Sequence, residues 1–167
     1  MAGGEGTRLR PLTSNCPKPM LPLANRPMME HIVGLLKQHG ITEIVVTVAF
    51  LANQIRTYFG DGSEFGVRMV YATEDQPLGT AGSVRNAMDE LTERFLVISG
   101  DVLTDIDLGH IIATHEANDA LADQVLDGAC TVVAGFLADA RGGLVDFLAL
   151  RVGQEGCRRF FHQLLVA

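Results

Sequence analysis

The sequence has too few cysteines, spaced too widely, to build a disulfide framework or a zinc site. Its 167 residues contain only Cys16, Cys130 and Cys157, an odd number with no Cys-x-x-Cys pair and no cysteine and histidine at metal-ligand spacing. Small secreted domains need dense cysteine pairs, and structural zinc sites need closely spaced ligands. The cysteine pattern therefore argues against both classes.

The sequence also lacks a membrane-spanning run, a signal peptide and an excess of basic residues. No apolar stretch is long enough to cross a bilayer. The net charge is −7, and 47% of the residues are hydrophobic, as in an ordinary soluble globular domain. An acidic balance argues against general nucleic-acid binding. We therefore expect one cytoplasmic domain that binds neither a membrane nor nucleic acid.

Several familiar catalytic and phosphate-binding patterns are missing as well. His110 and His115 are five residues apart, so they do not form the His-Glu-x-x-His zinc motif. The P-loop needs Lys-Ser or Lys-Thr after its glycines, and the dinucleotide fingerprint would need a glycine in place of Leu9. No Ser/His/Asp or Cys/His nucleophile arrangement is legible. Any phosphate site must therefore follow another pattern.

The first twenty residues, by contrast, are rich in glycine and positive charge. Gly3, Gly4 and Gly6 let backbone approach a ligand closely, and successive amides in such a turn form an anion-binding concavity. Arg8 and Lys18 supply the two cations that bind phosphate. Residues 1–26 contain four bases and one acid. We interpret the segment as a cradle for a nucleoside triphosphate, although the glycines alone also fit an ordinary turn near a terminus.

Beyond this cradle, predicted strands and helices alternate. Apolar and β-branched runs predict strands at 43–49, 67–71 and 95–98, and apolar residues at helical spacing predict helices at 27–39, 51–59, 80–91 and 108–118. The alternation predicts an α/β fold, with a mostly parallel sheet covered by helices on both faces. Ligands in such sheets bind outside the carboxyl ends of the strands. Glu74 and Asp101 each follow a predicted strand, so we expect them at that edge.

The N-terminal string, Gly3-Gly-x-Gly-Thr-Arg-Leu-x-Pro-Leu-Thr followed by Lys18-Pro-Met, resembles the signature of the sugar-1-phosphate nucleotidylyltransferases. Within that family, the segments Pro77-Leu-Gly-Thr-Ala-Gly-Ser83 and Phe95-Leu-Val-Ile-Ser-Gly-Asp101 are most similar to mannose-1-phosphate guanylyltransferases. The resemblance covers about residues 1–120. It implies a three-layer α/β/α Rossmann-like nucleotide-diphospho-sugar transferase fold, whose first strand would end at Met1 and is expected to be missing here.

The resemblance also implies a reaction between a nucleoside triphosphate and a sugar-1-phosphate. The sugar phosphate attacks the α-phosphorus in line and expels pyrophosphate, which requires positioning and charge stabilisation more than acid–base catalysis. By resemblance, Arg8 holds the pyrophosphate, Lys18 lies near the α-phosphate and Asp101 is the ligand of Mg²⁺. From the residues alone, Asp101 also fits a turn aspartate and Lys18 a solvated loop lysine. Asp105 and Asp107 are expected in a turn and as a helix cap.

Nucleotide contacts are expected in two segments. They are Ala2, Gly3, Gly4, Gly6 and Thr7 in the cradle, and Glu74, Pro77, Gly79 and Thr80 in a base-binding loop. An ionised carboxylate at Glu74 can only accept hydrogen bonds. Guanine offers two adjacent donors on its Watson–Crick edge, whereas uracil and thymine offer one donor between two acceptors. Glu74 therefore favours GTP, although backbone groups can read a base equally well.

The resemblance stops at about residue 120, and residues 121–167 form a divergent tail. The tail has an expected strand at 129–137 and an apolar run at 144–152 that fits a strand or a buried helix. It lacks the second acidic metal ligand of the family. It also lacks the family's Glu-Lys-Pro segment, because no lysine follows Lys37. Our hypothesis is an incomplete or frame-shifted reading of a longer enzyme, in which residues 1–120 are the nucleotide-binding part.

Two functions remain open from the sequence. The first is an enzyme, incomplete as it stands, that uses Mg²⁺ to make an NDP-sugar, with GTP and mannose-1-phosphate as the expected substrates. The second is a non-catalytic regulatory or scaffold homologue that uses the same fold for protein contacts. Retention of the glycines, Arg8 and Asp101 favours the enzyme. Either protein could form a homo-oligomer.

Overall fold

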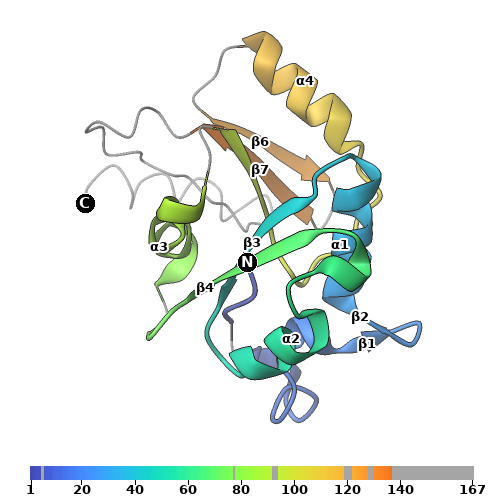
Figure 1. Cartoon of the computed structure of the whole chain (residues 1–167), viewed down its shortest axis with the longest axis vertical. Helices are drawn as coiled ribbons and strands as arrows, with labels where there is room; N and C mark the ends of the chain where they lie inside the picture. Colours follow the sequence, from blue (N-terminus) through green and yellow to red (C-terminus); the bar gives the residue numbers. More distant parts are fainter. Residues whose placement is uncertain (5, 77, 92–93, 119–121, 128–129, 137–167) are drawn as a thin grey trace.

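The computed structural model of the chain describes residues 1–4, 6–76, 78–91, 94–118, 122–127 and 130–136 (Figure 1). The helices are α1 (Met28–Gln38), α2 (Ala52–Phe59), α3 (Gly79–Asn86) and α4 (Leu108–Asn118), with 3-10 turns η1 (Thr7–Leu9), η2 (Lys18–Met20), η3 (Ser63–Phe65) and η4 (Met88–Glu90). The strands are β1 (Pro22–Leu23), β2 (Arg26–Pro27), β3 (Glu43–Val48), β4 (Arg68–Thr73), β5 (Arg94–Ile98), β6 (Ala122–Asp127) and β7 (Cys130–Phe136). Pro77 and the apolar run at 144–152 lie outside the described residues.

The strands confirm the predicted α/β class. β3 and β4 pair in parallel, with Glu43 opposite Arg68 and Val48 opposite Thr73. β5 pairs with β7, and β7 with β6, in both cases antiparallel. The sequence did not predict the β6–β7 hairpin as such, although β7 matches the strand expected at 129–137. β1 and β2 form a separate small ribbon.

The first two residues lie between the two larger sheets and connect them. The amino nitrogen of Met1 donates to the carbonyl of Ile98 at 2.8 Å, and the Met1 carbonyl accepts from Gly100 at 2.7 Å. This pair of bonds is that of a parallel bridge opposite Ser99. Ala2 donates to the carbonyl of Thr47 in β3 at 2.9 Å. The spatial order is therefore β4, β3, residues 1–2, β5, β7, β6.

Helices cover both faces of these strands, which makes the three layers that the sequence predicted. On one face, Met29 of α1 and Ile55 of α2 pack against Val48 of β3, and α4 continues this layer through Leu108. On the other face, α3 packs through Val84 against β5 and Met1. Figure 1 shows α3 on the opposite side of β3 and β4 from α1. No helix within the described ranges is long and apolar enough to cross a membrane.

Local chemistry explains where the helices begin. Pro27, expected as the first helical residue, is instead the residue before α1, because its extended conformation (φ −53°, ψ 141°) belongs to β2. Leu51, expected inside α2, precedes that helix in a left-handed conformation with φ 52°. Asp107 caps α4 as predicted, since its Oδ1 accepts from the backbone N–H of His110 at 3.0 Å. The predicted helix 80–91 ends at Asn86 and continues as η4.

Candidate active site

Three chain segments meet where β3, β4 and β5 end. A side chain built on Gly3 would place its Cβ 3.5 Å from the Ala49 Cβ and 3.5 Å from both carboxylate oxygens of Glu74. A Cβ on Gly100 would lie only 2.8 Å from the carbonyl oxygen of Met1. The cradle, the end of β4 and the end of β5 are therefore in close contact at one edge of the fold. Glycine is needed at position 100, because a backbone atom occupies the space of any side chain.

The cradle turns sharply at Gly6 and is held by a buried threonine. Gly6 has φ 62° and ψ 29°, a left-handed conformation that glycine adopts without steric cost. Its carbonyl accepts a hydrogen bond of 2.8 Å from Oγ1 of Thr13, a side chain with no exposed surface. Gly4 has open space around it, and Ala2 is packed in the core. The turn therefore has a fixed conformation with an unobstructed outer side.

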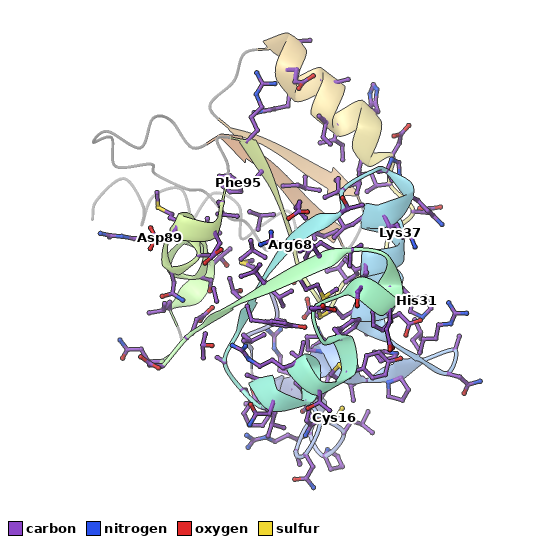
Figure 2. The ribbon with its side chains drawn as sticks, in the orientation of Figure 1. Cys16, His31, Lys37, Arg68, Asp89 and Phe95 are labelled. Atoms are coloured by element: carbon purple, nitrogen blue, oxygen red, sulfur yellow. The ribbon has the colours of Figure 1, made fainter. Side chains whose placement is uncertain are left out.

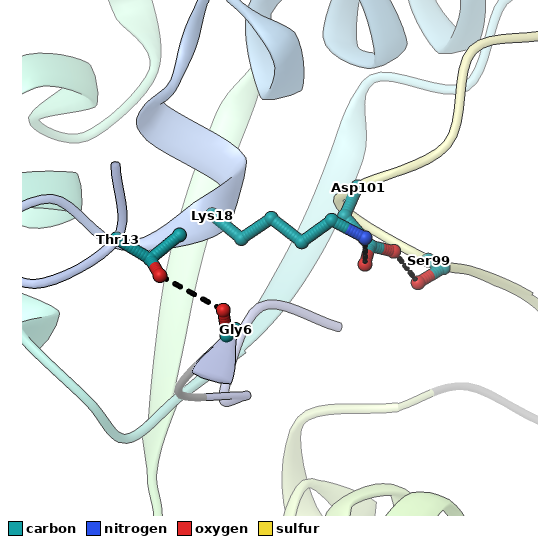
Figure 3. Close-up of polar contacts among 5 residues, drawn as sticks. All are labelled: Gly6, Thr13, Lys18, Ser99 and Asp101. Atoms are coloured by element: carbon teal, nitrogen blue, oxygen red, sulfur yellow. Dashed lines mark hydrogen bonds and ion pairs between the residues drawn. The ribbon is translucent and has the colours of Figure 1, made fainter. Parts of the chain in front are cut away.

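Lys18 and Asp101 are in direct contact across this edge, 83 residues apart in the chain (Figure 3). The Lys18 ammonium donates to Oδ2 of Asp101 at 2.5 Å, and the hydroxyl of Ser99 donates to Oδ1. The two ionic side chains are 21% and 18% exposed, so water screens their attraction only in part. Lys18 is held in place by η2 between Pro17 and Pro19, both buried. The structure thus brings together a cation and a carboxylate that the sequence had proposed separately.

Arg8 and Thr7 lie on η1 and are exposed. Arg8 makes no hydrogen bond or ion pair with another residue in the part of the chain that the structure describes. A guanidinium in this position is available to an anionic ligand at the cradle. Among the described residues, no hydrogen bond or ion pair joins Arg8 to Lys18 or Asp101, so the expected proximity of Arg8 to these two residues stays a prediction.

Glu74 is a buried acidic side chain, with 8% of its surface exposed. Its Oε2 accepts weakly from the backbone of Leu78 at 3.4 Å, whereas Oε1 is buried without a hydrogen-bond partner among the described residues. A buried polar atom that lacks a partner is unfavourable by about 1–3 kcal/mol. Since both oxygens also face Gly3, the carboxylate is placed to accept hydrogen bonds from a ligand in the cradle.

The predicted base-binding loop begins α3. Gly79, the first residue of α3, has φ 68° with open space beside it. Its carbonyl accepts from the hydroxyl of Ser83 at 2.7 Å, which fixes the first turn. Thr80 follows, partly buried, and Pro77 lies outside the described residues. The end of β4 and the start of α3 thus flank the unpartnered oxygen of Glu74.

The carboxylates fit a metal that arrives with a ligand better than a pre-formed metal cage. No group of three or more His, Cys, Asp or Glu side chains is placed to hold a metal ion within the described ranges. Asp101 offers one carboxylate. Mg²⁺ in phosphate-handling sites is held by one or two carboxylates together with substrate phosphates and water. A single carboxylate near an anion cradle satisfies that requirement.

Sequence reasoning missed two residues that shape the site. Ser99 orients the Asp101 carboxylate, and Thr13 fixes the turn at Gly6. Both belong to strings that the sequence singled out, Ser99-Gly-Asp and Pro11-Leu-Thr. A serine or threonine in a string that contains a glycine turn was therefore the sequence signal that could have identified both residues.

Comparison with known proteins identifies close relatives of this chain. The family model described as "Nucleotidyl transferase" matches residues 1–132. A UTP–glucose-1-phosphate uridylyltransferase of Synechocystis is 38% identical over 134 residues, and a mannose-1-phosphate guanylyltransferase of Mycobacterium tuberculosis is 39% identical over 121 residues. The matches cover 73% and 72% of this chain but 34% of each relative, so the chain spans about a third of their length.

A solved structure has the same fold over most of this chain. HddC from Yersinia pseudotuberculosis, crystallised with GMP-PN, superposes with a TM-score of 0.65 at 26% identity. The alignment covers 77% of this chain and 58% of that one. The shared fold therefore extends over most of the residues described here.

Proposed function

Because the chain belongs to the nucleotidyl transferase family, we propose that it carries the nucleotide-binding part of an enzyme that joins a nucleoside triphosphate to a sugar-1-phosphate, with release of pyrophosphate. The observation that supports this most is the contact of Lys18 with Asp101 beside the glycine cradle. A cation, a carboxylate and free backbone amides are the groups that phosphoryl transfer needs.

Each side chain has a distinct task in this proposal. Arg8, exposed beside the cradle, binds the β- and γ-phosphates and the departing pyrophosphate. Lys18 leaves Asp101 for the α-phosphate and neutralises the charge that develops there. Asp101, oriented by Ser99, holds Mg²⁺, which supplies charge stabilisation for the triphosphate when bound. Positioning and electrostatics carry the reaction, and the protein need not act as an acid or base.

We further propose that the base is guanine and the sugar phosphate mannose-1-phosphate. The unpartnered Oε1 of Glu74 supports guanine, since a carboxylate satisfies two adjacent donors. The relatives include both a uridylyltransferase and a guanylyltransferase at similar identity, so the choice rests on Glu74 and on the motifs. The matches cover only 34% of each of these relatives. We therefore propose the full reaction for a protein that also contains the parts of those relatives that this chain does not match.

Nucleotide-dependent thermal stabilisation tests binding separately from turnover. The full chain is heated with Mg²⁺ and either GTP or UTP, and pyrophosphate release is followed with GTP plus mannose-1-phosphate and with UTP plus glucose-1-phosphate. We expect GTP to raise the Tm more than UTP, and any turnover to favour the GTP pair. A shift of the Tm is expected to require Mg²⁺.

Asp101→Asn provides the matched variant, with Asp105→Asn as its control. Asp105 is an exposed residue outside the helices and strands, four positions away. We expect Asp101→Asn to abolish the Mg²⁺-dependent part of the GTP shift, and Asp105→Asn to leave it intact. If no nucleotide shifts the Tm of the chain, a non-catalytic scaffold becomes the better explanation of the fold.

A further inference from the structure

In the structure, Lys18 stands where a metal ion would bind to Asp101. The Lys18 ammonium lies 2.5 Å from Oδ2 of Asp101, and the hydroxyl of Ser99 donates to Oδ1 (Figure 3). Mg²⁺ coordinates a carboxylate oxygen at about 2.0–2.1 Å. An ammonium and a metal ion cannot share one oxygen at these distances, because two cations so close together repel each other strongly. In this conformation Lys18 therefore excludes a metal ion from Oδ2.

Asp101 is the fixed partner of this ion pair and Lys18 is the movable one. The aspartate side chain is short, its Oδ1 is held by Ser99, and the N–H of Gly100 bonds to the carbonyl of Met1 at 2.7 Å. The backbone of Lys18 is fixed in η2, but its ammonium is at the end of a flexible four-carbon stem. A rearrangement of the pair therefore moves the ammonium and leaves the carboxylate in place.

The glycine cradle lies directly beside the Lys18 side chain. A Cβ built on Gly6 would be 3.3 Å from the Cβ of Lys18. An anion bound by the backbone amides of the cradle would thus lie near the stem of this lysine. An ammonium has three N–H donors and binds phosphate as a point charge, and a triphosphate offers it more negative charge than one carboxylate does. A phosphate group at the cradle is therefore a competitor of Asp101 for Lys18.

Partial burial makes each charge of the pair depend on a partner. The side chains of Lys18 and Asp101 are both about four-fifths covered, so water screens them only in part. When one partner of such a pair is removed, the charge that is left behind is poorly compensated. Withdrawal of the ammonium would therefore leave Asp101 in need of another cation, which a divalent metal ion supplies.

We propose that Lys18 is a removable substitute for the metal ion. It excludes metal from Asp101 until a phosphate group draws the ammonium away, so that metal and triphosphate bind together. The inference rests on the proposed function for the identity of the phosphate ligand. Because coupling between two ligands is reciprocal, each ligand raises the affinity of the chain for the other by the same factor. A metal ion without nucleotide binds weakly, and the Lys18 side chain is the cause.

The test measures metal binding in the absence of nucleotide. Mn²⁺, which favours the same oxygen ligands as Mg²⁺, is titrated into the ¹⁵N-labelled full chain, and its paramagnetic broadening of the Gly100 amide signal reports a metal ion at Asp101. Lys18→Met removes the ammonium and keeps an unbranched side chain. We expect this variant to need about tenfold less Mn²⁺ for half-maximal broadening. The gain is expected to disappear in the double variant Lys18→Met/Asp101→Asn.

Lys37→Met is the matched control, because Lys18 and Lys37 are the two lysines of the sequence. Lys37, labelled in Figure 2, lies on α1, and its ammonium donates to the carbonyl of Phe65 at 2.9 Å. The substitution changes the net charge of the chain by the same amount but leaves Lys18 paired with Asp101. We expect its Mn²⁺ titration to match that of the parent chain.

Acetylation of the lysines tests the ion pair without relying on Lys18→Met. The parent chain and Asp101→Asn are treated with an N-hydroxysuccinimide ester of acetic acid, and peptide mass spectrometry gives the rate at Lys18 relative to Lys37. We expect the relative rate to rise about fivefold in Asp101→Asn, as for the loss of a partly exposed ion pair. An unchanged ratio would show that Asp101 does not hold the ammonium, and would overturn the inference.

The Mn²⁺ titrations decide the exclusion of metal. Equal midpoints for the parent chain and Lys18→Met would overturn it, and so would a gain that persists without Asp101. Where GTP binds, it is expected to lower the Mn²⁺ midpoint of the parent chain more than that of Lys18→Met, and equal effects would overturn the coupling. A gain in Lys18→Met with no nucleotide effect on the Tm would support the role of Lys18 and refute the proposed function, so the two failures are distinguishable.

Discussion

Glu74 is the residue on which nucleotide choice is expected to depend most. Its Oε1 is buried with no hydrogen-bond partner in the part of the chain that the structure describes, and both carboxylate oxygens face Gly3. In Glu74→Gln one carboxylate oxygen becomes an NH₂ donor. The amide no longer matches the two adjacent donors of guanine, but it can still bond to uracil, whose edge presents both donors and acceptors. We expect GTP affinity, measured by calorimetry with Mg²⁺, to fall about tenfold, with little change for UTP.

The neighbouring Asp75→Asn is the control for this substitution, because Asp75 is exposed. The unliganded Glu74→Gln protein is also expected to have a higher Tm, since a neutral amide is buried more easily than a charged carboxylate. Equal losses for GTP and UTP would show that Glu74 supports the loop without reading the base.

Gly100 is required by a backbone contact that any side chain would break. A Cβ at this position would lie 2.8 Å from the Met1 carbonyl oxygen, which itself accepts from the Gly100 N–H. We expect Gly100→Ala to lower the free energy of unfolding by about 1–3 kcal/mol in urea titrations. Gly34→Ala is the matched change: nothing lies within 4 Å of a Cβ there, and the site is inside α1.

Gly34→Ala should raise stability by about 0.5–1 kcal/mol, because alanine favours the helix. Opposite signs for the same substitution would separate the close backbone contact at Gly100 from a general intolerance of alanine. A neutral Gly100→Ala would show that Met1 moves away without cost.

At the residue scale, sequence reasoning located the ends of the strands but not the contacts made there. Glu74 and Asp101 were placed at one edge because each follows a strand, and the parallel strands bring them there. Lys18 was proposed from its charge and motif. The hydrogen bonds of Ser99 and Thr13 depend on turn geometry, which spacing along the chain does not encode.

Among the elements, α4 depends on one capping side chain. Asp107 Oδ1 accepts from the N–H of His110, and the first helical residue, Leu108, has no exposed surface. We expect Asp107→Ala to reduce the free energy of unfolding by about 1 kcal/mol in urea titrations. Asp105→Ala, an exposed change two residues earlier, is expected to stay within about 0.5 kcal/mol of the parent. Similar losses in both variants would contradict the capping role.

The presence and type of the helices and strands could be predicted from the sequence better than their ends or their packing. Helical and β-branched periodicity identified every helix and strand between residues 27 and 118, since burial on one stripe or on both faces leaves a pattern in the sequence. The ends were less predictable, because Pro27 and Leu51 adopt backbone conformations set by the preceding turn. The antiparallel placement of β7 beside β5 depends on contacts between distant segments, which no local pattern reports.

On the scale of the whole molecule, the amino group of Met1 couples stability to pH. The group is buried between β3 and β5, and this desolvation lowers its pKa from 8.0 to about 6, although Asp101 and Glu74 oppose the change. Between pH 8 and pH 6 the unfolded chain binds this proton and the folded chain does not. For a chain that begins at Met1, stability therefore falls as the pH is lowered from 8 to 6, by roughly 2–3 kcal/mol.

Acetylation of the Met1 amino group isolates this contribution, because it removes the charge and leaves every other titrating group in place. Urea titrations from pH 5.5 to 8.5 are expected to show a steeper slope for the free amine than for the acetylated chain. Identical slopes for the free and the acetylated chain would mean that the amine reaches water, and that the hydrogen bond from Met1 to the Ile98 carbonyl does not form in solution.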